Sequence, residues 1–490
     1  MLEKHLEKPS PCLKEAQSIV HLTLTHPHGR ASSSRGGAQP QLAAGTVFDM
    51  TSNPRPRTHV PTPIPTMSRF GRAVLLFLAL FAAWHLCSTL FADAPPAPGG
   101  HPAEKQAPAG SGAAGKASGF PLAREAGVRA AAGKGRNFVV SPLSIHAALA
   151  LVVAGARGDT RRELLGFLGS ASLDELHRAP AIKLVGRLNG LSQASFACGV
   201  WVDRRRALRP EFMATGASRY GATAESVDFV SGAEQARLRV NAFVADATKQ
   251  LIRDILPRGS VNSDTAVVLA NALYFKGAWS QPFDVFTSPF HAPGGTTVGV
   301  RSMTTGRSQY TARYRGFRAL KLPYKNDVQQ QAAFYMLILL PDSDALSLAD
   351  LYDKAVLMPE FIEKHTPAKK VSIRQFMVPK FKFTFEFEAS SDMQKLGVTR
   401  AFNRGNFSGM VSGEDELSIT GVYHKATVEV DELGTVAAAA TAVVMRTTSL
   451  DFGAAFVDFV ADRPFLFAVV EERTTTVLFL GHVVNPLVVE

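Results

Sequence analysis

The side chain best suited to acid–base chemistry is His424, in the stretch "GVYHKATVEV". A histidine acts as a general base when a nucleophile lies within hydrogen-bond reach and a third group orients the ring. Nothing near His424 in the sequence supplies that context, and the chain has no Gly-rich phosphate loop, no HExxH and no GxSxG motif. Counting serines and histidines leaves a hydrolase site open. A structural core histidine is the better-supported interpretation, and no catalytic residue is predicted.

Metal or redox chemistry needs cysteines and histidines at short, regular spacing. The three cysteines, Cys12, Cys87 and Cys198, lie far apart, and no CxxC or Cys/His ligand spacing occurs. Only Cys198 falls in the part of the chain with a globular pattern, so no internal disulfide is predicted there. Its apolar surroundings, "SFACGVWV", indicate a buried thiol. We therefore predict no metal site and no cofactor.

The formal net charge is +11, and the densest basic cluster is "DRRRALR" at residues 203–209. Such a cluster could bind nucleic acid or another polyanion. A solvated strand end or loop is the better-supported interpretation, so no specific nucleic-acid partner is predicted.

The folded elements that could position side chains begin late in the chain. Residues 1–72 lack a sustained hydrophobic period and are predicted to be a disordered extension, and residues 93–117 a Pro/Gly/Ala linker. Between them, residues 73–92 are apolar enough to span a bilayer. We favour an uncleaved signal anchor over a cleaved signal peptide, because the small-residue cleavage pattern is poor. The alternative to both is a mis-assigned translation start, which adds residues that are absent from the real protein. Residues 118–490 are predicted to form the domain.

Helical patterns come first in the domain. In "SPLSIHAALALVVAGARG", Ser141 is predicted to be the N-cap and Pro142 the first helical residue, and Gly155 can end the helix. The next stretch, "DTRRELLGFLG", offers a capping box from Thr160 to Glu163.

Strand patterns follow. The runs at 264–277 and 333–341 are almost continuously apolar, which suits strands buried on both faces. Residues 381–388 alternate between Phe and polar side chains and predict a half-buried strand, and residues 465–486 predict a hairpin. Helices followed by many antiparallel strands indicate an α+β domain.

Five stretches of the domain resemble the serpin family in their order and spacing, and the hinge region looks most like plant serpins. They are "NFVVSPLSIHAALALVVAGARGDTRRELL", "LANALYFKGAWSQPF", "VPKFKFTFEFE", "HKATVEVDELGTVAAAATA" and "FVADRPFLFAVVEERTTTVLFLGHVVNP". The resemblance covers essentially all of residues 120–490. It implies the serpin fold, with large antiparallel-rich sheets, a surrounding set of helices and an exposed reactive-centre loop, and it implies a protein that is not an enzyme.

Between Val430 and Phe459 lie 28 residues with no clear element, and so long a loop in a compact domain is usually functional. In serpins this loop is the bait for a protease, and after cleavage its first half enters the main sheet as a new central strand. Alternate residues of a strand share a face. At the hinge, Gly434 would give the backbone freedom to swing. The resemblance assigns the buried face of the inserted strand to four small residues, Thr435, Ala437, Ala439 and Thr441.

Other family positions match residues of this chain one by one. The resemblance implies a polar cluster beneath the centre of the sheet, which lets two strands part, formed by Ser141, Ser144, Asn271 and His424. It also implies an aromatic residue where insertion begins, Trp279, and an acid at the start of the hinge paired with a lysine, Glu432 with Lys380. Ordinary core or surface structure is the alternative for each of them.

The chain departs from the family pattern at three positions. Leu433 stands where a polar residue is usual, Val436 where Glu is common, and Arg463 where His is frequent. Leu433 and Val436 are expected to point outward, so the small residues of the insertion face are retained.

Family spacing, counted from Glu432, places the scissile bond between Thr448 and Ser449, with Arg446–Thr447 as the alternative. The predicted function is suicide-substrate inhibition of a serine or cysteine protease through a covalent complex. Thr448 fits proteases that accept small or β-branched residues better than a trypsin-like target. A non-inhibitory serpin fold that serves as a storage, chaperone or binding protein is the alternative.

The predicted signal anchor would place the domain in the secretory lumen or outside the cell, with membrane anchoring through residues 73–92. The one N-glycosylation sequon of the chain, at Asn406, would then be relevant. A cytoplasmic protein is expected instead if the N-terminal extension is not real.

Overall fold

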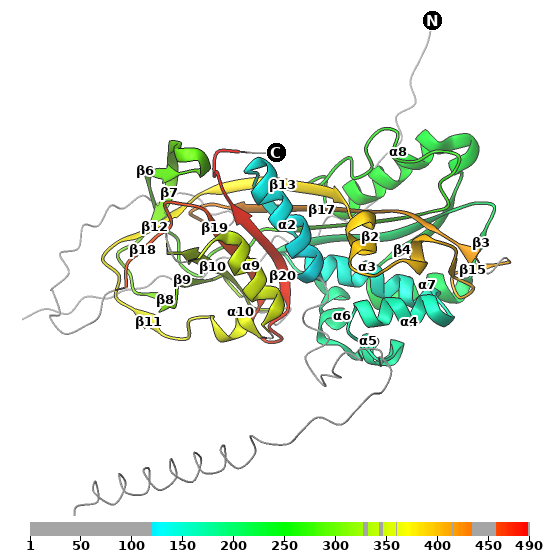
Figure 1. The fold of residues 1–490 in the computed structure, drawn as a ribbon, viewed down its shortest axis with the longest axis horizontal. Helices are drawn as coiled ribbons and strands as arrows, with labels where there is room; N and C mark the ends of the chain where they lie inside the picture. Colours follow the sequence, from blue (N-terminus) through cyan, green and yellow to red (C-terminus); the bar gives the residue numbers. More distant parts are fainter. Residues whose placement is uncertain are drawn as a thin grey trace, which may run out of the picture. The chain divides into compact units, whose positions relative to one another are not determined.

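A computed structural model describes residues 120–326, 332–342, 346–358, 360–413, 416–433 and 457–488. Helices predominate up to Ala247 and strands predominate after it (Figure 1). The α-helices are α2 (Phe120–Lys134), α3 (Pro142–Gly155), α4 (Gly158–Phe167), α5 (Leu173–Arg178), α6 (Pro180–Val185), α7 (Pro210–Tyr220), α8 (Phe229–Ala247), α9 (Leu348–Leu357), α10 (Phe361–Lys364) and α11 (Ser390–Lys395).

Three sheets carry most of the strands. The five-stranded sheet has the order β13 (Phe381–Glu388), β17 (Ile419–Val430), β5 (Val267–Phe275), β2 (Ala194–Asp203) and β4 (Thr223–Val227). The seven-stranded sheet has the order β1 (Phe138–Val140), β20 (Val477–Val483), β19 (Phe465–Glu471), β10 (Phe334–Pro341), β9 (Phe317–Pro323), β8 (Gln309–Tyr314) and β11 (Lys370–Val371). The four-stranded sheet has the order β18 (Phe459–Val460), β12 (Phe376–Pro379), β7 (Thr297–Thr304) and β6 (Asp284–His291). Two short pairs complete the strands, β14 (Gly405–Asn406) with β16 (Glu416–Leu417) and β15 (Val411–Ser412) with β3 (Ala207–Leu208).

The five-stranded sheet lies between two helical layers, with α8 on one face and α3 on the other (Figure 1). Side chains of β2 alternate between these layers, as the period of a strand requires. Trp201 packs edge-on against Phe243 of α8 at a ring distance of 5.4 Å. Phe196 and Cys198 point to the opposite face and join the larger core, which includes α3. This burial on both faces explains why β2 and β5 are almost entirely apolar.

Helix α3, which packs against the five-stranded sheet, begins where the sequence predicts. The Ser141 hydroxyl accepts the backbone N–H of Ser144 at 3.0 Å, Pro142 opens α3, and α3 ends at Gly155. This N-cap is confirmed.

The capping box predicted from Thr160 to Glu163 is wrong. Helix α4 begins earlier, at Gly158, and its N-cap residue, Arg157, makes no side-chain cap. The two side chains bond to other segments instead. The Thr160 hydroxyl accepts the backbone N–H of Asn406 at 3.0 Å, and Glu163 accepts the amides of residues 399 and 400, each at 2.7 Å.

The predicted strands are confirmed; β5 and β10 are shorter than predicted, and β13 has the predicted bounds. The run at 264–277 forms β5, the run at 333–341 forms β10, and the alternating stretch is β13. The predicted hairpin is β19 paired antiparallel with β20. Strand β17 ends at Val430 and β18 begins at Phe459, so the long connection between strands lies where the sequence indicates.

Within the described ranges, no helix is both long and apolar enough to cross a membrane. Residues 73–92, the predicted signal anchor, lie outside those ranges.

Candidate functional site

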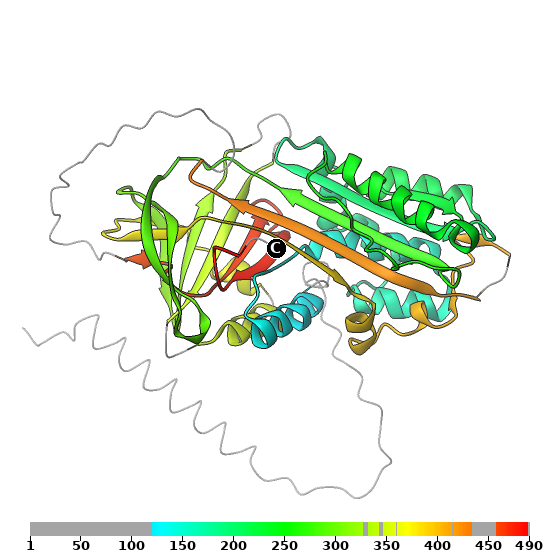
Figure 2. The ribbon, with the colours of Figure 1, turned by 90° about the horizontal axis from the view of Figure 1, so that it is seen from above.

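The centre of the five-stranded sheet is a seam between two parallel strands, β5 and β17 (Figure 2). Each of these strands is antiparallel to its outer neighbour, β2 for β5 and β13 for β17. Both strands of the seam finish at the same edge of the sheet, at Phe275 and Val430. A further strand that runs back from this edge would be antiparallel to β5 and to β17 at once. Antiparallel pairs have slightly better hydrogen-bond geometry than parallel pairs.

A buried polar cluster crosses this seam on the face covered by α3. The side chains of Asn271 in β5 and His424 in β17 are register partners, and His424 Nδ1 lies 2.6 Å from Asn271 Oδ1. The Ser144 hydroxyl donates to the same Asn271 oxygen at 2.6 Å, and the Ser141 backbone N–H donates to His424 Nε2 at 3.1 Å. The structure therefore brings together all four residues that the sequence assigned to this cluster.

These contacts define the state of the His424 ring. Because Nε2 accepts from the Ser141 amide, the proton of the neutral ring sits on Nδ1 and is donated to Asn271. Burial lowers the pKa of His424 to about 3, so the ring is neutral at physiological pH. His424 thus holds two strands and a helix end together, and its hydrogen-bond partners among the described residues are the Asn271 side chain and the Ser141 backbone amide.

The residues after β5 bind the residues after β17 at the sheet edge. Trp279 donates from its indole Nε1 to the Asp431 carbonyl at 2.6 Å and from its backbone to the Leu433 carbonyl at 3.2 Å. The Phe283 amide donates to the Glu432 carbonyl at 3.0 Å. The Trp279 ring is itself fixed by stacking on Tyr324 at 4.4 Å. The predicted aromatic residue therefore contacts the start of the long loop.

An ion pair links Glu432 to Lys380, as the sequence predicts. Topology explains the pairing, because β13 runs opposite to β17 and Lys380 precedes β13 at the edge where β17 ends. The hydrogen bond from Lys380 lowers the pKa of the Glu432 carboxyl. Both side chains remain about one-third exposed, so this pair contributes little to global stability.

Sequence reasoning missed a second carboxylate, Glu429, on the face of the sheet opposite His424. Its oxygens lie 3.1 Å from Lys276 Nζ and 3.0 Å from Lys382 Nζ, and Tyr274 donates to it at 3.3 Å. Burial would raise the pKa of Glu429, but the hydrogen bonds from the two lysines outweigh it and the pKa is lowered. Lys276 and Tyr274 belong to the β5 side of the seam, whereas Lys382 belongs to β13. The alternation of buried and exposed residues along β17 was the available signal.

The far end of the loop is fixed in a different sheet. Asp458 accepts the backbone N–H of Gln375 at 3.1 Å and of Arg374 at 3.3 Å, and β18 then pairs parallel with β12. Phe459 is fully buried. The long connection therefore leaves the five-stranded sheet after Val430 and returns to the four-stranded sheet at Phe459.

Several predicted site residues lie outside the described residues. They are the hinge and insertion residues Gly434, Thr435, Ala437, Ala439 and Thr441 and both candidate bonds, Thr448–Ser449 and Arg446–Thr447.

The remaining candidates have structural surroundings. Cys198 is fully buried, and burial raises the pKa of its thiol to about 12. In the basic cluster, Arg204 pairs with Asp228 at 3.0 Å and Arg205 with Asp203 at 2.5 Å. Across the described part of the chain, no group of three or more His, Cys, Asp or Glu side chains could hold a metal ion.

Comparison with known proteins identifies the class to which this fold and seam belong. The family model of serpins, described as serine protease inhibitors, matches residues 118–486. The chain therefore belongs to the serpin family. Putative serpin-Z12 of Oryza sativa subsp. japonica is 62% identical over 405 residues, which cover 79% of this chain and 95% of the relative. The relationship supports a plant-type serpin, and protease inhibition is the general activity of its family.

Solved structures agree with the fold. The native stressed conformation of Arabidopsis AtSerpin1 aligns with a TM-score of 0.70 and 35% identity, over 77% of this chain and all of that one. Human thyroxine-binding globulin complexed with thyroxine aligns with a TM-score of 0.64 over 76% of this chain and 98% of that one. At 23% identity, the second likeness shows the fold alone.

Proposed function

We propose that this protein inhibits serine or cysteine proteases as a suicide substrate, by inserting its cleaved loop between β5 and β17. One observation carries the proposal: β5 and β17 pair directly and in parallel, and the loop leaves the edge at which both strands end. An inserted strand would replace one parallel ladder with two antiparallel ones. The gain in backbone hydrogen bonds favours the inserted state.

The covalent step takes place on the loop. The serine hydroxyl or cysteine thiol of the target attacks the carbonyl carbon of Thr448. The C–N bond to Ser449 breaks, Ser449 leaves as a free amine that takes up a proton, and Thr448 remains on the protease as an ester or thioester. Insertion of the loop then carries the bound protease across the domain before water can release it.

The described contacts have defined parts in this scheme. Strands lie about 4.8 Å apart, so insertion would roughly double the distance between β5 and β17. The bond between His424 and Asn271 crosses the seam and must break, as must the bonds from Trp279 to the start of the loop. The pair of Glu432 with Lys380 stays on one side of the seam and would hold the hinge until the loop swings.

The test separates recognition of the loop from its insertion. In Thr435→Arg, a guanidinium would have to enter the sheet with the first inserting residue, and burying an unpaired charge costs several kcal/mol. We expect the loop to be cut at the same bond without a covalent complex accumulating. Val436→Glu changes the adjacent, outward-facing position and is the matched control, which should inhibit like the parent.

The measurement is the ratio of SDS-stable complex to cleaved inhibitor across a panel of serine and cysteine proteases. The released peptide should begin at Ser449, and a start at Thr447 would assign the alternative bond. If the parent forms no covalent complex with any protease of the panel, the inhibitory proposal fails in favour of a non-inhibitory serpin fold. If Thr435→Arg traps protease as well as the parent, the assignment of the insertion face is wrong.

We further propose that residues 118–490 form the serpin domain and that residues 73–92 anchor it in the membrane with the domain in the lumen or outside the cell. The support is the apolar stretch of sequence. At the predicted N-glycosylation sequon, Asn406 is half-buried, and its side-chain oxygen accepts two hydrogen bonds from Ser408. Membrane fractionation with protease protection tests the anchor, and recovery of the full-length chain in the soluble cytosolic fraction would disprove it.

A further inference from the structure

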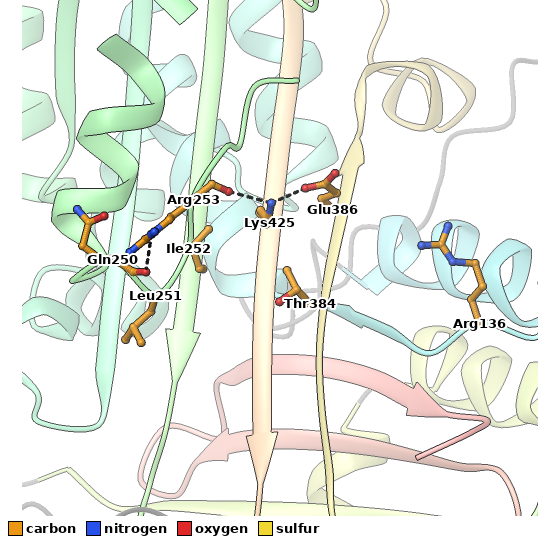
Figure 3. Close-up of a pocket in the computed structure, with 8 residues that line it drawn as sticks. All are labelled: Arg136, Gln250, Leu251, Ile252, Arg253, Thr384, Glu386 and Lys425. Atoms are coloured by element: carbon orange, nitrogen blue, oxygen red, sulfur yellow. Dashed lines mark hydrogen bonds and ion pairs between the residues drawn. The ribbon is translucent and has the colours of Figure 1, made fainter. Parts of the chain in front are cut away.

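A cavity of about 460 Å³ opens on the α8 face of the five-stranded sheet, over β17 and β13 (Figure 3). The charged side chains that line it point apart and are engaged within the chain. Lys425 Nζ lies 2.6 Å from Glu386 and donates to the Arg253 carbonyl at 2.9 Å. Arg253 Nε donates to the Gln250 carbonyl at 3.3 Å. These lining residues present no converging set to a ligand, in contrast to the residues that hold the two ends of the long loop.

The start of the long loop is bound by the link between β5 and β6. This link, residues 276–283, joins the five-stranded sheet to the four-stranded sheet. The Trp279 backbone N–H donates to the Leu433 carbonyl at 3.2 Å. The Phe283 backbone N–H donates to the Glu432 carbonyl at 3.0 Å. The position of Phe283 therefore decides where the loop leaves the domain.

The end of the long loop is bound by β12 and by the residue before it. Phe376 opens β12 and is the register partner of Phe459 in β18. The Phe459 backbone N–H donates to the Gln375 carbonyl at 2.9 Å. The Gln375 backbone N–H donates to the Asp458 carboxylate at 3.1 Å. The position of Phe376 therefore decides where the loop returns to the domain.

One aromatic stack joins these two points of attachment. The rings of Phe283 and Phe376 lie parallel, at 2° to one another, with their centroids 5.4 Å apart. In the four-stranded sheet β7 lies between β6 and β12, so Phe283, which precedes β6, reaches past β7 to the next strand. Trp279 packs edge-on against Phe283 at a ring distance of 6.1 Å. Three rings in contact thus connect the start of the loop to its end.

We propose that Phe283 and Phe376 are positioning residues, which fix the separation of the two loop ends and so hold the loop in place for a target protease. The 28 residues between Val430 and Phe459 could span roughly 95 Å when fully extended, so the loop itself does not set this separation. A loop with fixed ends loses less conformational freedom when a protease binds it. The proposal rests on the proposed function of the loop as the bait.

The stack should act on recognition of the loop and not on its later insertion. Insertion would part β5 from β17, whereas the stack joins the link after β5 to β12 and does not cross that seam. Replacing either ring should therefore slow the reaction of the protease with the intact loop. The ratio of covalent complex to cleaved inhibitor, which is set after the bond is cut, should stay as in the parent.

The test measures the second-order rate constant at which a protease consumes the intact loop, with covalent complex and cleaved inhibitor counted together. The panel includes subtilisin, which accepts many sequences, and sequencing of the new N-terminus locates the cut. We expect Phe283→Leu and Phe376→Leu each to lower this rate constant about 5-fold, because leucine keeps the site apolar but cannot stack. The double variant should be no slower than either single variant, since one substitution already removes the stack.

Phe243→Leu is the matched control. Phe243 of α8 packs edge-on against Trp201 at 5.4 Å, away from both loop ends, and its replacement should change the rate constant less than 2-fold. Phe283→Tyr keeps a ring that can stack and should react like the parent, which separates the stack from a general loss of folding. Unchanged rate constants in both leucine variants, or a double variant slowed by the product of the two single effects, overturn the proposal.

The same measurements separate this proposal from the inhibitory one. If the parent yields only cleaved product, the inhibitory proposal fails, while the rate constants still decide whether the stack positions the loop. If the leucine variants keep the rate constant of the parent but form less covalent complex, the stack acts on insertion and the positioning proposal is overturned.

Discussion

Glu429 offers a controlled way to test whether the seam opens, because its two lysine partners lie on opposite sides of it. Lys276 Nζ lies 3.1 Å away on the β5 side, and Lys382 Nζ lies 3.0 Å away on the β13 side. Insertion between β5 and β17 would break the first contact and keep the second. Lys276→Gln should therefore speed conversion of the intact protein to a loop-inserted form, whereas Lys382→Gln should not.

The expected size follows from the surroundings of the pair. A hydrogen bond to a charged group contributes about 1.5–3 kcal/mol. Glu429 is 16% exposed and Lys276 is 26% exposed, so solvent screening reduces this contribution to about 1 kcal/mol. Glu429 keeps Lys382 in the Lys276→Gln variant and is not left as an unpaired charge. If the contact is fully lost when the seam opens, about 1 kcal/mol corresponds to roughly a 5-fold faster conversion.

The assay heats each intact variant at a fixed temperature and follows the loss of the native form on non-denaturing gels, with residual protease inhibition measured in parallel. We expect Lys276→Gln to convert roughly 5-fold faster than the parent and Lys382→Gln to stay within about 2-fold of it. Equal acceleration by both variants would mean that Glu429 stabilises the domain in general and does not close the seam. The reasoning about an opening between β5 and β17 would then be refuted.

Three further predictions concern the buried histidines, the aspartate at the start of β18 and the buried thiol of Cys198. Burial lowers the pKa of three histidines to about 4, 3 and 4: His146, His424 and His482. In the unfolded chain each histidine takes up a proton below about pH 6.5, whereas in the folded protein it stays neutral. The free energy of unfolding should therefore be unaffected above that pH and should fall by about 1.4 kcal/mol per histidine at pH 5.5. Urea unfolding at pH 7.5 and 5.5 measures this change, and an unchanged unfolding midpoint would contradict the prediction. Asp458→Ala should free the two amides that fix the start of β18 and lower the free energy of unfolding by about 1–3 kcal/mol, with Asp264→Ala in an exposed turn as the control for the urea midpoint. Cys198 should resist iodoacetamide in the folded protein and react on unfolding in urea, and rapid alkylation in native buffer would contradict its burial.

The fold follows from local pattern where the pattern has one dominant cause. Strand β13 matches its predicted bounds at both ends, because alternating Phe residues have only one face to bury. The N-cap at Ser141 was predictable for the same reason, since a capping serine followed by proline suits few other structures. The capping box at Thr160 failed because tertiary partners claimed both side chains, and a sequence window contains no information about those partners.

The candidate site divides in a similar way. The cluster of Ser141, Ser144, Asn271 and His424 could be assigned only through resemblance to a family, because its members come from three segments whose meeting no periodicity predicts. Glu429 and Asp458 escaped notice for a related reason. Nothing in the local sequence distinguishes either residue from a solvent-exposed acid. The structural role of each depends on which segment of the chain carries its hydrogen-bond partners.

The buried polar groups of the seam help to explain why the sheet stays closed, although under the proposed mechanism insertion of the loop would stabilise it further. Asn271 and His424 are fully buried and satisfy each other across the two strands. If the strands part with nothing between them, both groups lose a partner, and an unsatisfied buried polar group costs about 1–3 kcal/mol. An incoming strand brings backbone N–H and C=O groups that can replace the lost partner. Opening is therefore penalised when the seam is empty and relieved when the strand arrives. An apolar seam would lack this distinction, since its side chains would lose only packing. Under the proposed mechanism, the buried histidine and asparagine thus delay opening until the cleaved loop is in place to fill the seam.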